Sequence, residues 1–230
     1  RTLCEATAAA GGRVMIDAEE SWIQEAIDAL AEDMMSDYNR ERVVVYNTVQ
    51  MYRHDRLAYL AAMAARAEED GYLCGVKVVR GAYMEKERAR AAQQGYPSPI
   101  QPDKAASDRD FDAAVKWVLE RIAQIHLVAG SHNEESNLKL CQWMGEMGLE
   151  PGDARVSFAQ LLGMSDPITF NLAARGYNVA KYVPYGPIRE AIPYLIRRAQ
   201  ENTSVAGQTS RELALLREEQ QRRKRIHAEG

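Results

Sequence analysis

"LCGVKVV", residues 73–79, is a short run rich in apolar and β-branched residues that leads directly into "RGAY" at 80–83. Such a run is typical of a strand buried inside a sheet. Five further runs of the same kind recur along the chain, so the sequence predicts a fold built around six strands. They are "RVMID" (13–17), "RVVVYNT" (42–48), "IHLVAG" (125–130), "RVSFAQ" (155–160) and "NVAKYVP" (178–184).

Helical segments are expected between these runs, and glycines indicate where they end. Gly71, Gly148 and Gly176 close three of them, since glycine adopts the left-handed conformation of a helix terminus without strain. The spacing between most strand starts is the length of one βα unit, which predicts an α/β fold with a parallel sheet. The expected helices are 22–38, 55–70, 85–95, 110–124, 134–148, 167–176 and 188–201.

Polar residues follow the predicted strand ends, where parallel sheets carry their ligand sites. The chain contains neither GxGxxG nor GxxxxGK[ST], so no nucleotide fingerprint supports a doubly wound sheet. We therefore expect a (βα)8 TIM-like barrel, although a closed barrel needs eight strands and the sequence provides six. The strand-end groups are Asp17-Ala18-Glu19, Gln50, Arg80-Gly81-Ala82-Tyr83, Ser131-His132-Asn133, Gln160 and Tyr185-Gly186.

Composition argues against several classes of protein. The 29 basic and 33 acidic residues give a net charge of −4, which argues against nucleic acid as the main partner. No apolar run approaches the roughly 20 residues of a membrane span, so we expect a soluble or at most peripheral protein. Cys4, Cys74 and Cys141 are odd in number and widely spaced, which favours packing roles in a reducing compartment.

The two ends of the chain support different expectations. Arg1 opens an apparent helix without an initiator methionine, so we expect that an upstream part has been removed. Residues 207–230 end in "EEQQRRKRIHAEG", which predicts a solvated terminal helix or, through its basic end, a membrane or partner contact. The expected division is a barrel part at 1–206 and a helical tail at 207–230.

Two charged residues stand out in the predicted strands. Asp17 ends the first strand, where it would either cap the following helix or face the site and order a ligand. Lys77 lies within the apolar "GVKVV", where an ammonium group is costly without an anionic partner. We expect a cofactor or substrate to supply that partner, so both residues are candidates for the site.

The turns after the third and fourth strands carry weaker motifs. In "RGAY", the small residues at 81–82 permit a close backbone approach, Arg80 suits a phosphate and Tyr83 offers a stacking surface, although a tight βα turn explains the motif equally well. In "SHNEE", Asn133 is a candidate helix cap, and His132 has no second His or Cys at ligand spacing, so no metal is expected. No nucleophile motif such as GxSxG occurs, so such a site would leave the hard chemistry to a bound cofactor.

"PYLIRRAQEN", residues 193–202, places Tyr194, Arg197, Arg198 and Glu201 on one face of a helix. One interpretation is a solvated face that contains the Arg197/Glu201 ion pair. The other is a pocket for a small carboxylate. The opposite stripe is expected to anchor the helix through Ile188, Ala191, Ile192, Leu195 and Ala199.

Five motifs, in order across residues 14–202, closely resemble the proline dehydrogenase family, in particular its monofunctional, mitochondrial-type branch. They are "IDAEE", "KVVRGAYMEKERARA", "GSHNEE", "FAQLLGM" and "KYVPYGPIREAIPYLIRRAQEN". The resemblance implies a distorted (βα)8 barrel with FAD at the carboxyl ends of the strands. It also implies oxidation of L-proline to Δ1-pyrroline-5-carboxylate by hydride transfer to FAD N5, the first step of proline catabolism, with electrons passed to a membrane quinone.

The same resemblance implies roles for individual positions. Asp17 and Lys77 are the implied catalytic residues, and the paired arginines of the last motif are implied to hold the proline carboxylate. The implied substrate-binding set comprises Leu161, Tyr182, Tyr194, Arg197, Arg198 and Glu201. The implied cofactor-binding set comprises Gln50, Lys77, Val79, Arg80, Gly81, Ala82, Tyr83, Ser131, His132, Asn133 and Gln160.

The family pattern also includes two strands upstream of "IDAEE", one of which carries a lysine that contacts the substrate. This chain contains neither, so the first two barrel strands are expected from an upstream or companion segment. The implied location is the bacterial cytoplasm with peripheral association to the inner membrane, or the mitochondrial matrix and inner membrane.

Three other functions remain open. Hydroxyproline oxidation would use the same machinery, although the bulk of Tyr182 crowds the ring position that would carry the hydroxyl. A phosphate-binding lyase or aldolase barrel would use Lys77 as a Schiff-base amine, although its strand has no second basic group beside it. A fragment without catalytic activity would follow from the missing strands.

Overall fold

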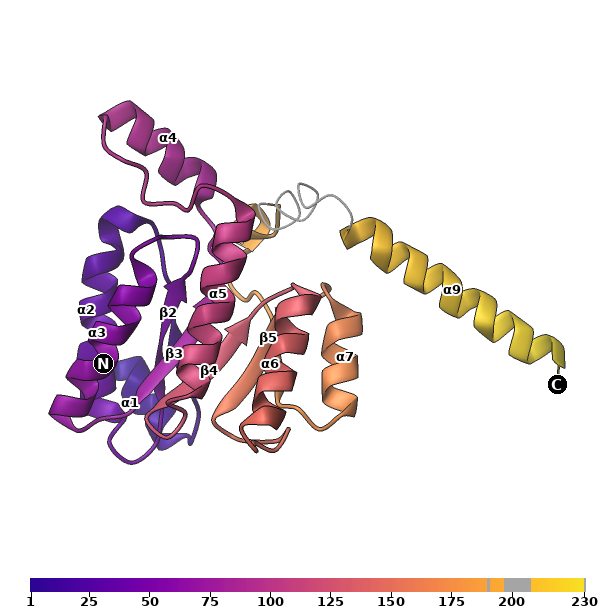
Figure 1. Cartoon of the computed structure of the whole chain (residues 1–230), viewed down its shortest axis with the longest axis horizontal. Coiled ribbons are helices and arrows are strands. Elements are labelled where there is room, and N and C mark those ends of the chain that lie inside the picture. Colours follow the sequence, from indigo (N-terminus) through magenta and orange to yellow (C-terminus); the bar gives the residue numbers. More distant parts are fainter. Residues whose placement is uncertain (190, 197–207, 230) are drawn as a thin grey trace. The chain divides into compact units, whose positions relative to one another are not determined.

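The computed structural model, drawn in Figure 1, describes residues 1–189, 191–196 and 208–229. The chain divides into two compact units. The first unit comprises Arg1–Gln160 and Ile168–Ala180. The second comprises Leu161–Pro167 and the chain from Lys181 onward. The first four strands of the sheet lie entirely within the first unit.

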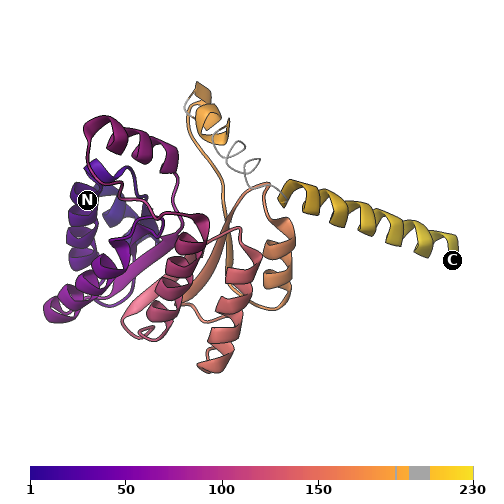
Figure 2. The same cartoon turned by 45° about the horizontal axis from the view of Figure 1, so that its top comes forward.

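Six strands form one sheet, in the order in which they follow along the chain. They are β1 (Val14–Ile16), β2 (Val45–Gln50), β3 (Cys74–Val79), β4 (Ile125–Gly130), β5 (Val156–Leu161) and β6 (Val179–Tyr182). Neighbouring strands from β1 to β5 pair in parallel. The sheet curls into a half-barrel with helices on its outside (Figure 2), which confirms the predicted α/β, TIM-like fold class.

Helices connect consecutive strands, as parallel pairing requires. Gly71 and Gly95 end α3 and α4 in the left-handed conformation, with φ of 70° and 72°. Gly148 and Gly176 follow α6 and α7 with positive φ as well, so the predicted closing glycines are confirmed. The helices are α1 (Thr2–Ala9), α2 (Ser21–Tyr38), α3 (Arg56–Asp70), α4 (Met84–Gln94), α5 (Lys104–Leu119), α6 (Glu134–Glu146), α7 (Asp166–Ala174) and α9 (Gln208–Glu229).

The face of the sheet that packs against the helices forms the main core. Val76 and Val78 of β3, Leu127 of β4 and Phe158 of β5 are buried there, and Phe111 of α5 covers them in the same cluster. Each such side chain contributes about 1.5–3 kcal/mol when it is removed from water. This apolar face therefore fixes the strands, and with them the position of every residue at the strand ends.

The opposite face of the sheet carries a more polar row. Thr48, Lys77, Val128 and Ser157 lie side by side across β2 to β5, because the parallel register pairs them in turn. The helix-facing side is more apolar, although Asn47 of β2 bonds there to Asp28 of α2 and Tyr59 of α3, both at 2.9 Å. The only charged member of this row is Lys77, which the sequence had marked as unusual.

Two predicted elements are displaced in the structure. β2 begins at Val45 and not at residue 42, because the side chain of Asn39 binds the backbone N–H groups of Val44 and Val45, both at 2.9 Å. α5 begins at Lys104 and not at residue 110, because Asp103 caps it by accepting a hydrogen bond from the N–H of Ala106 at 2.7 Å. It ends at Leu119, ahead of a turn. The other predicted strands, and the other helices before residue 188, agree with the structure to within two residues.

In the second unit, the segment after β5 is tied to the end of β6. The N–H of Leu162 donates to the carbonyl of Tyr182 at 2.9 Å. The ammonium of Lys181 donates to the carbonyl of Met164 at 2.7 Å and to Asp166 Oδ1 at 2.8 Å. These bonds hold residues 161–167 against the strand that leads into the C-terminal part.

Residues 188–189 and 191–196 are helical, as the sequence predicts. The stripe that was expected to anchor this helix is nevertheless exposed at Ile188, Ile192 and Leu195, so that expectation is wrong for the described residues. The described part of this unit is small and offers too little apolar surface to bury a stripe. Ala199 lies outside the described residues.

The terminal helix α9 has the character of a solvated helix. Arg222 and Arg223 form ion pairs with Glu219 at 2.6 and 2.8 Å, and Leu213 and Leu216 are exposed. Such fully exposed pairs are screened by solvent and add little to stability. Among the residues that the structure describes, no helix is both long enough and apolar enough to cross a bilayer.

Candidate functional site

The carboxyl ends of β1, β2 and β3 bring together several of the predicted site residues; they are called the strand-end rim below (Asp17, Glu19, Gln50, Lys77 and residues 80–83). Lys77 of β3 forms an ion pair with Asp17, which follows β1. The curl of the sheet lets these two groups meet although β2 lies between their strands. Asp17 therefore supplies an anionic partner for Lys77, and the expected contact of Lys77 with a cofactor or substrate stays a prediction.

This pairing also decides between the two roles considered for Asp17. α2 begins at Ser21, and no side-chain hydrogen bond from its N-cap residue supports it. The backbone N–H and the hydroxyl of Ser21 instead donate to the carboxylate of Glu87 at 2.5 and 2.7 Å. Glu87 comes from α4 and is fully buried. The helix-cap interpretation of Asp17 is therefore wrong, and its carboxylate faces Lys77.

Gln50 links two loops of the strand-end rim. Its side-chain amide donates to the carbonyl of Glu19 at 2.8 Å and accepts a hydrogen bond from the N–H of Ala82 at 3.2 Å. The hydroxyl of Tyr83 donates to Glu19 Oε2 at 2.5 Å. Three predicted cofactor-binding residues, from two different strand ends, thus lie within one hydrogen-bonded group.

Gly81 is required by its surroundings and not merely allowed. Its φ of 138° is a conformation that other residues rarely adopt. A Cβ at this position would lie 2.4 Å from the ring of Tyr52, which is itself buried. The N–H of Tyr52 donates to the carbonyl of Arg80 at 2.6 Å, so the ring and the backbone of Tyr52 both hold the "RGAY" segment.

Arg80 is directed toward α5 and α6. Its guanidinium donates to Asp108 at 2.5 Å, to the hydroxyl of Ser131 at 2.7 Å and to the hydroxyl of Ser136 at 2.9 Å. It also lies over the ring of Phe111, with 4.3 Å between the guanidinium carbon and the ring centroid. Arg80 is thus a link between three elements, and its predicted contact with a phosphate stays a prediction.

The carboxylate of Asp108 is held in its ionised form. Partial burial on its own would raise the pKa of Asp108, but hydrogen bonds from Lys104 and Arg80 outweigh burial and lower the pKa below its ordinary value. Lys104 reaches the second carboxylate oxygen at 2.5 Å. A neutral Asp108 would leave Arg80 with a weaker partner, so this charge keeps Arg80 in place.

The ends of β4 and β5 contribute the remaining predicted residues of the first unit. The side chain of Asn133 accepts a hydrogen bond from the N–H of Ser136 at 3.0 Å, which confirms it as the cap of α6. Gln160 donates to the carbonyl of Ser131 at 3.3 Å and accepts from Thr169 at 3.0 Å. His132 lies half-buried in the same turn, and Val79 is half-buried at the end of β3.

The second unit carries the described part of the predicted substrate set. Leu161 is buried, and the rings of Tyr182 and Tyr194 lie 5.9 Å apart at an angle of 56°. Tyr182 comes from β6 and Tyr194 from the helical segment that follows. Arg197, Arg198 and Glu201 lie outside the described residues, so their predicted contact with the substrate carboxylate stays a prediction.

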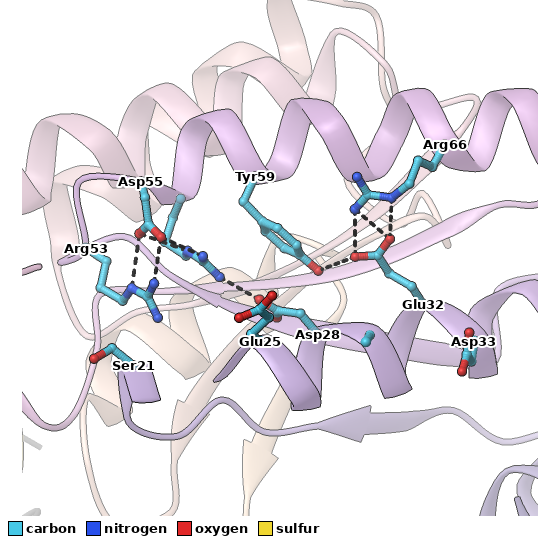
Figure 3. A pocket seen from close by; sticks show the side chains of 11 residues that line it. Ser21, Glu25, Asp28, Glu32, Asp33, Arg53, Asp55, Tyr59 and Arg66 are labelled. Carbon is cyan, nitrogen blue, oxygen red and sulfur yellow. Dashed lines mark hydrogen bonds and ion pairs between the residues drawn. The ribbon is translucent and has the colours of Figure 1, made fainter. Parts of the chain in front are cut away.

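A separate groove of about 600 Å³ lies between α2 and α3, and Figure 3 shows its charged lining. Asp28 accepts from Arg56 at 2.7 Å, and Asp55 accepts from Arg53 at 2.6 Å and from Arg56 at 2.7 Å. Glu32 accepts from Arg66 at 2.6 Å. Because each of these guanidiniums already binds a carboxylate, we interpret the groove as a network that joins α2 to α3.

This network sets the ionisation of two groups. Burial alone would raise the pKa of Asp55, but hydrogen bonds from Arg56 and Arg53 reverse the effect and lower it to about 2. Burial, together with the nearby carboxylates of Asp28 and Glu32, raises the pKa of Tyr59. Tyr59 therefore stays a phenol and donates its hydrogen bond to Glu32 at 2.9 Å.

Three residues of the first unit support the strand-end rim although the sequence did not single them out, and one member of the rim, Glu19, has a role that the sequence did not predict. Glu19 belongs to a polar triplet at a predicted strand end, so its place was predicted but not its role. Tyr52 lies two residues after Gln50, which is the only sequence signal for it. Asp108 was missed because the predicted helix began at residue 110, after it. Glu87 gave no signal, since its partner Ser21 lies 66 residues away.

Comparisons with known proteins agree with the fold and with these motifs. The sequence model of a family described as "Proline dehydrogenase" matches residues 1–211. Proline dehydrogenase 1, mitochondrial, from Homo sapiens is 43% identical over 209 residues, which cover 90% of this chain and 35% of that protein. Hydroxyproline dehydrogenase from Xenopus laevis is 42% identical over 215 residues, which cover 92% of this chain and 46% of that protein.

A solved structure supports the same conclusion about the fold. Proline utilization A (PutA) from Bdellovibrio bacteriovorus, inactivated by N-propargylglycine, superposes with a TM-score of 0.83 at 25% identity. The match covers 90% of this chain and 21% of that one. This chain thus spans about a third of the length of the mitochondrial relatives that it matches. Since the family model covers most of its residues, the chain belongs to the proline dehydrogenase family.

Proposed function

We propose that this chain carries the main part of the active site of a flavin-dependent dehydrogenase that oxidises L-proline to Δ1-pyrroline-5-carboxylate. The observation that carries the proposal is the assembly of Lys77, Asp17, Gln50, Ala82 and Tyr83 at one set of strand ends in the first unit. These residues come from motifs at three different strand ends. Their juxtaposition is what a shared ligand would require.

The residues of the strand-end rim fit FAD. Lys77 supplies a positive charge, Gln50 supplies an amide, and Tyr83 supplies a half-buried aromatic ring. Residues 81–82 leave the backbone without a large side chain, so a planar ring system or a ribityl chain can approach it closely. When bound, FAD supplies a two-electron acceptor for the hydride that leaves the substrate.

The chain's own residues would orient the cofactor. The ion pair with Asp17 fixes the position of Lys77, and the hydrogen bonds of Gln50 fix its own amide group and the N–H of Ala82. Val79, Arg80, Gly81, Ser131, His132, Asn133 and Gln160 complete the proposed cofactor-binding set. Fixed donors of this kind need no reorganisation during the reaction, which is why preorganisation accelerates it.

The substrate would be held by the second unit's residues. We assign the proline carboxylate to Arg197 and Arg198, since a guanidinium binds a carboxylate through two parallel hydrogen bonds. Glu201 would orient these arginines. Tyr182, Tyr194 and Leu161 would contact the ring. The ring nitrogen must be neutral when the hydride leaves, so activity is expected to rise with pH as the bound amine loses its proton.

Hydroxyproline oxidation is a second candidate, because relatives named hydroxyproline dehydrogenase are about as similar as the proline enzymes. Tyr182 favours proline. Its ring, 5.9 Å from that of Tyr194, narrows the space for a hydroxylated ring. The ratio of kcat/KM for the two substrates measures this preference. A Schiff-base mechanism is disfavoured, because Asp17 already engages the amine of Lys77.

The partners are proposed on the same basis. Six of the eight strands of a barrel are present in the sheet, so a companion segment would contribute the two that complete it and a lysine for the substrate. A membrane quinone would accept the electrons. The named mitochondrial relatives favour the mitochondrial matrix and inner membrane, with any membrane contact peripheral.

The test begins with the purified chain and FAD. Titration should produce the absorption spectrum of a bound flavin, and L-proline added without oxygen should bleach it. Failure of the chain to bind FAD would contradict the proposal. Bleaching by L-hydroxyproline but not by L-proline would instead select the second candidate.

A further inference from the structure

Four residues of the strand-end rim form a closed ring of contacts. Gln50 donates to the carbonyl of Glu19 at 2.8 Å, and the N–H of Ala82 donates to Gln50 Oε1 at 3.2 Å. Ala82 is bonded to Tyr83, whose hydroxyl returns to Glu19 Oε2 at 2.5 Å. Three members of this ring belong to the proposed cofactor-binding set. The fourth, Glu19, does not.

The backbone of Glu19 is held in turn by buried side chains of α2. Its N–H donates to Gln24 Oε1 at 2.8 Å, and the amide nitrogen of Gln24 donates to Asp28 Oδ1 at 2.8 Å. Gln24 and Asp28 are both buried, and Asp28 is fixed in turn by Arg56. The loop that carries Glu19 is therefore anchored to the polar network between α2 and α3, part of which appears in Figure 3.

We propose that Glu19 is a positioning residue for the flavin, an inference that rests on the proposed function. Its carboxylate holds the phenol of Tyr83, and its carbonyl holds the amide of Gln50. By closing the ring, Glu19 fixes the orientation of an aromatic ring and of a backbone N–H that would both contact the flavin. Glu19 itself acts through these groups and not by touching the cofactor.

The physical basis is the strength of a hydrogen bond to a charged acceptor. A hydrogen bond from an O–H group to a carboxylate is shorter and about twice as strong as one between two neutral groups. Losing such a bond corresponds to about a 10- to 100-fold change in an equilibrium constant. Freeing the Tyr83 ring would also restore rotamer freedom that flavin binding must then remove.

The test compares flavin affinity in the full chain and its variants. Glu19→Ala should weaken FAD binding by about tenfold, measured by titrating the apo-protein and following flavin fluorescence. Glu19→Gln keeps an oxygen acceptor for Tyr83 and should recover part of the loss. Glu68→Ala is the matched control. This glutamate is exposed on α3, so its removal should leave FAD affinity within about twofold of the wild type.

A double-mutant cycle separates positioning from general stabilisation. Tyr83→Phe keeps the ring but removes the hydroxyl, so it should weaken FAD binding about as much as Glu19→Ala. The double variant should be no worse than either single variant, because both remove the same bond. Additive losses would overturn the inference, since they would mean that Glu19 acts independently of Tyr83.

The outcomes also distinguish this inference from the proposed function. A wild-type chain without any flavin affinity would overturn both. A wild-type chain that binds FAD, together with a Glu19→Ala variant that binds it equally well, would overturn the inference alone. If Glu19→Ala lowers only the melting temperature, the role of Glu19 is structural and the inference is again wrong. Tyr83→Phe provides the same test should Glu19→Ala not fold.

Discussion

The strand-end rim and the predicted clamp helix (188–201) carry the two halves of the proposed chemistry, and they are built very differently. Residues of the rim are held by the buried sheet and by bonds such as those of Gln50 and Glu19. The described part of the helix exposes its apolar side chains, including Ile188 and Leu195. A cofactor site can thus be preformed by the core, whereas a substrate site on a small element depends on other contacts.

The largest expected effect comes from removing Arg197, which we propose binds the carboxylate of the substrate. Arg197→Met should raise the KM for proline about 100-fold or more, since a bidentate ion pair is lost, while FAD remains bound. Steady-state kinetics and the flavin spectrum give the two readings. Arg189→Met, on the same helical segment, is the control and should leave the KM unchanged. Loss of flavin in Arg197→Met would show that the two halves are not separable.

A substitution in the strand-end rim should instead lower stability and FAD affinity. Gly81→Ala forces a Cβ to within 2.4 Å of the Tyr52 ring at a φ of 138°, so we expect it to lower the free energy of unfolding by about 3 kcal/mol. It should also weaken FAD binding. Denaturant unfolding and a flavin titration measure the two effects.

Gly95→Ala is the control for this change. Gly95 also has a positive φ, but apart from its neighbours in the chain nothing lies within 4 Å of the position that an added methyl group would occupy, so only the conformational cost of about 1 kcal/mol should remain. Equal decreases in the free energy of unfolding for Gly81→Ala and Gly95→Ala would contradict the role assigned to the Tyr52 ring.

Substrate preference should change without any effect on the rim. Tyr182→Ala should raise the ratio of kcat/KM for hydroxyproline over that for proline by about tenfold, because it enlarges the space beside the substrate ring. FAD affinity should not change. Tyr185→Ala, in which a fully exposed tyrosine is removed, should leave the ratio unaltered. A fall in FAD affinity in Tyr182→Ala would show that the two regions depend on each other.

The smallest expected effect is on the stability of the protein at low pH, through Asp55 in the polar network between α2 and α3. The pKa of Asp55 is lowered to about 2 from 3.8, so its ion pairs stabilise the folded state fully above pH 3.8 and the effect is lost as pH falls through 2. Because Asp55 is 39% exposed, solvent screening reduces the contribution to about 1 kcal/mol. The melting temperature of Asp55→Asn should therefore fall less between pH 5 and 2 than that of the wild type. Parallel curves would contradict the assignment.

Much of the fold could be predicted because its signals are local. Runs of β-branched residues marked the strands, and left-handed glycines such as Gly71 marked helix ends. The displaced starts of β2 and α5 were missed because they depend on side-chain hydrogen bonds by Asn39 and Asp103 that hydrophobic periodicity does not record. The division at residue 206 stays a prediction.

The site was predictable in a similar way. Because parallel strands end at a common edge, the sequence predicted that Asp17, Gln50, Lys77 and Tyr83 would lie near one another. It did not predict which groups would bond. The anion beside Lys77 proved to be a carboxylate 60 positions away, and the partners of Arg80 lie 28 to 56 positions away.

Signals local to the chain predicted the parallel strands, the glycines that close the helices and the family that the motifs resemble. Only the folded chain reveals that Asp17 pairs with Lys77, that the Tyr52 ring excludes a side chain at Gly81, and that Glu19 joins Gln50 to Tyr83. These two sets of features depend on interactions that act over different separations along the chain. Backbone preference and hydrophobic period act between neighbours in the chain, whereas hydrogen bonds and steric exclusion act between neighbours in space.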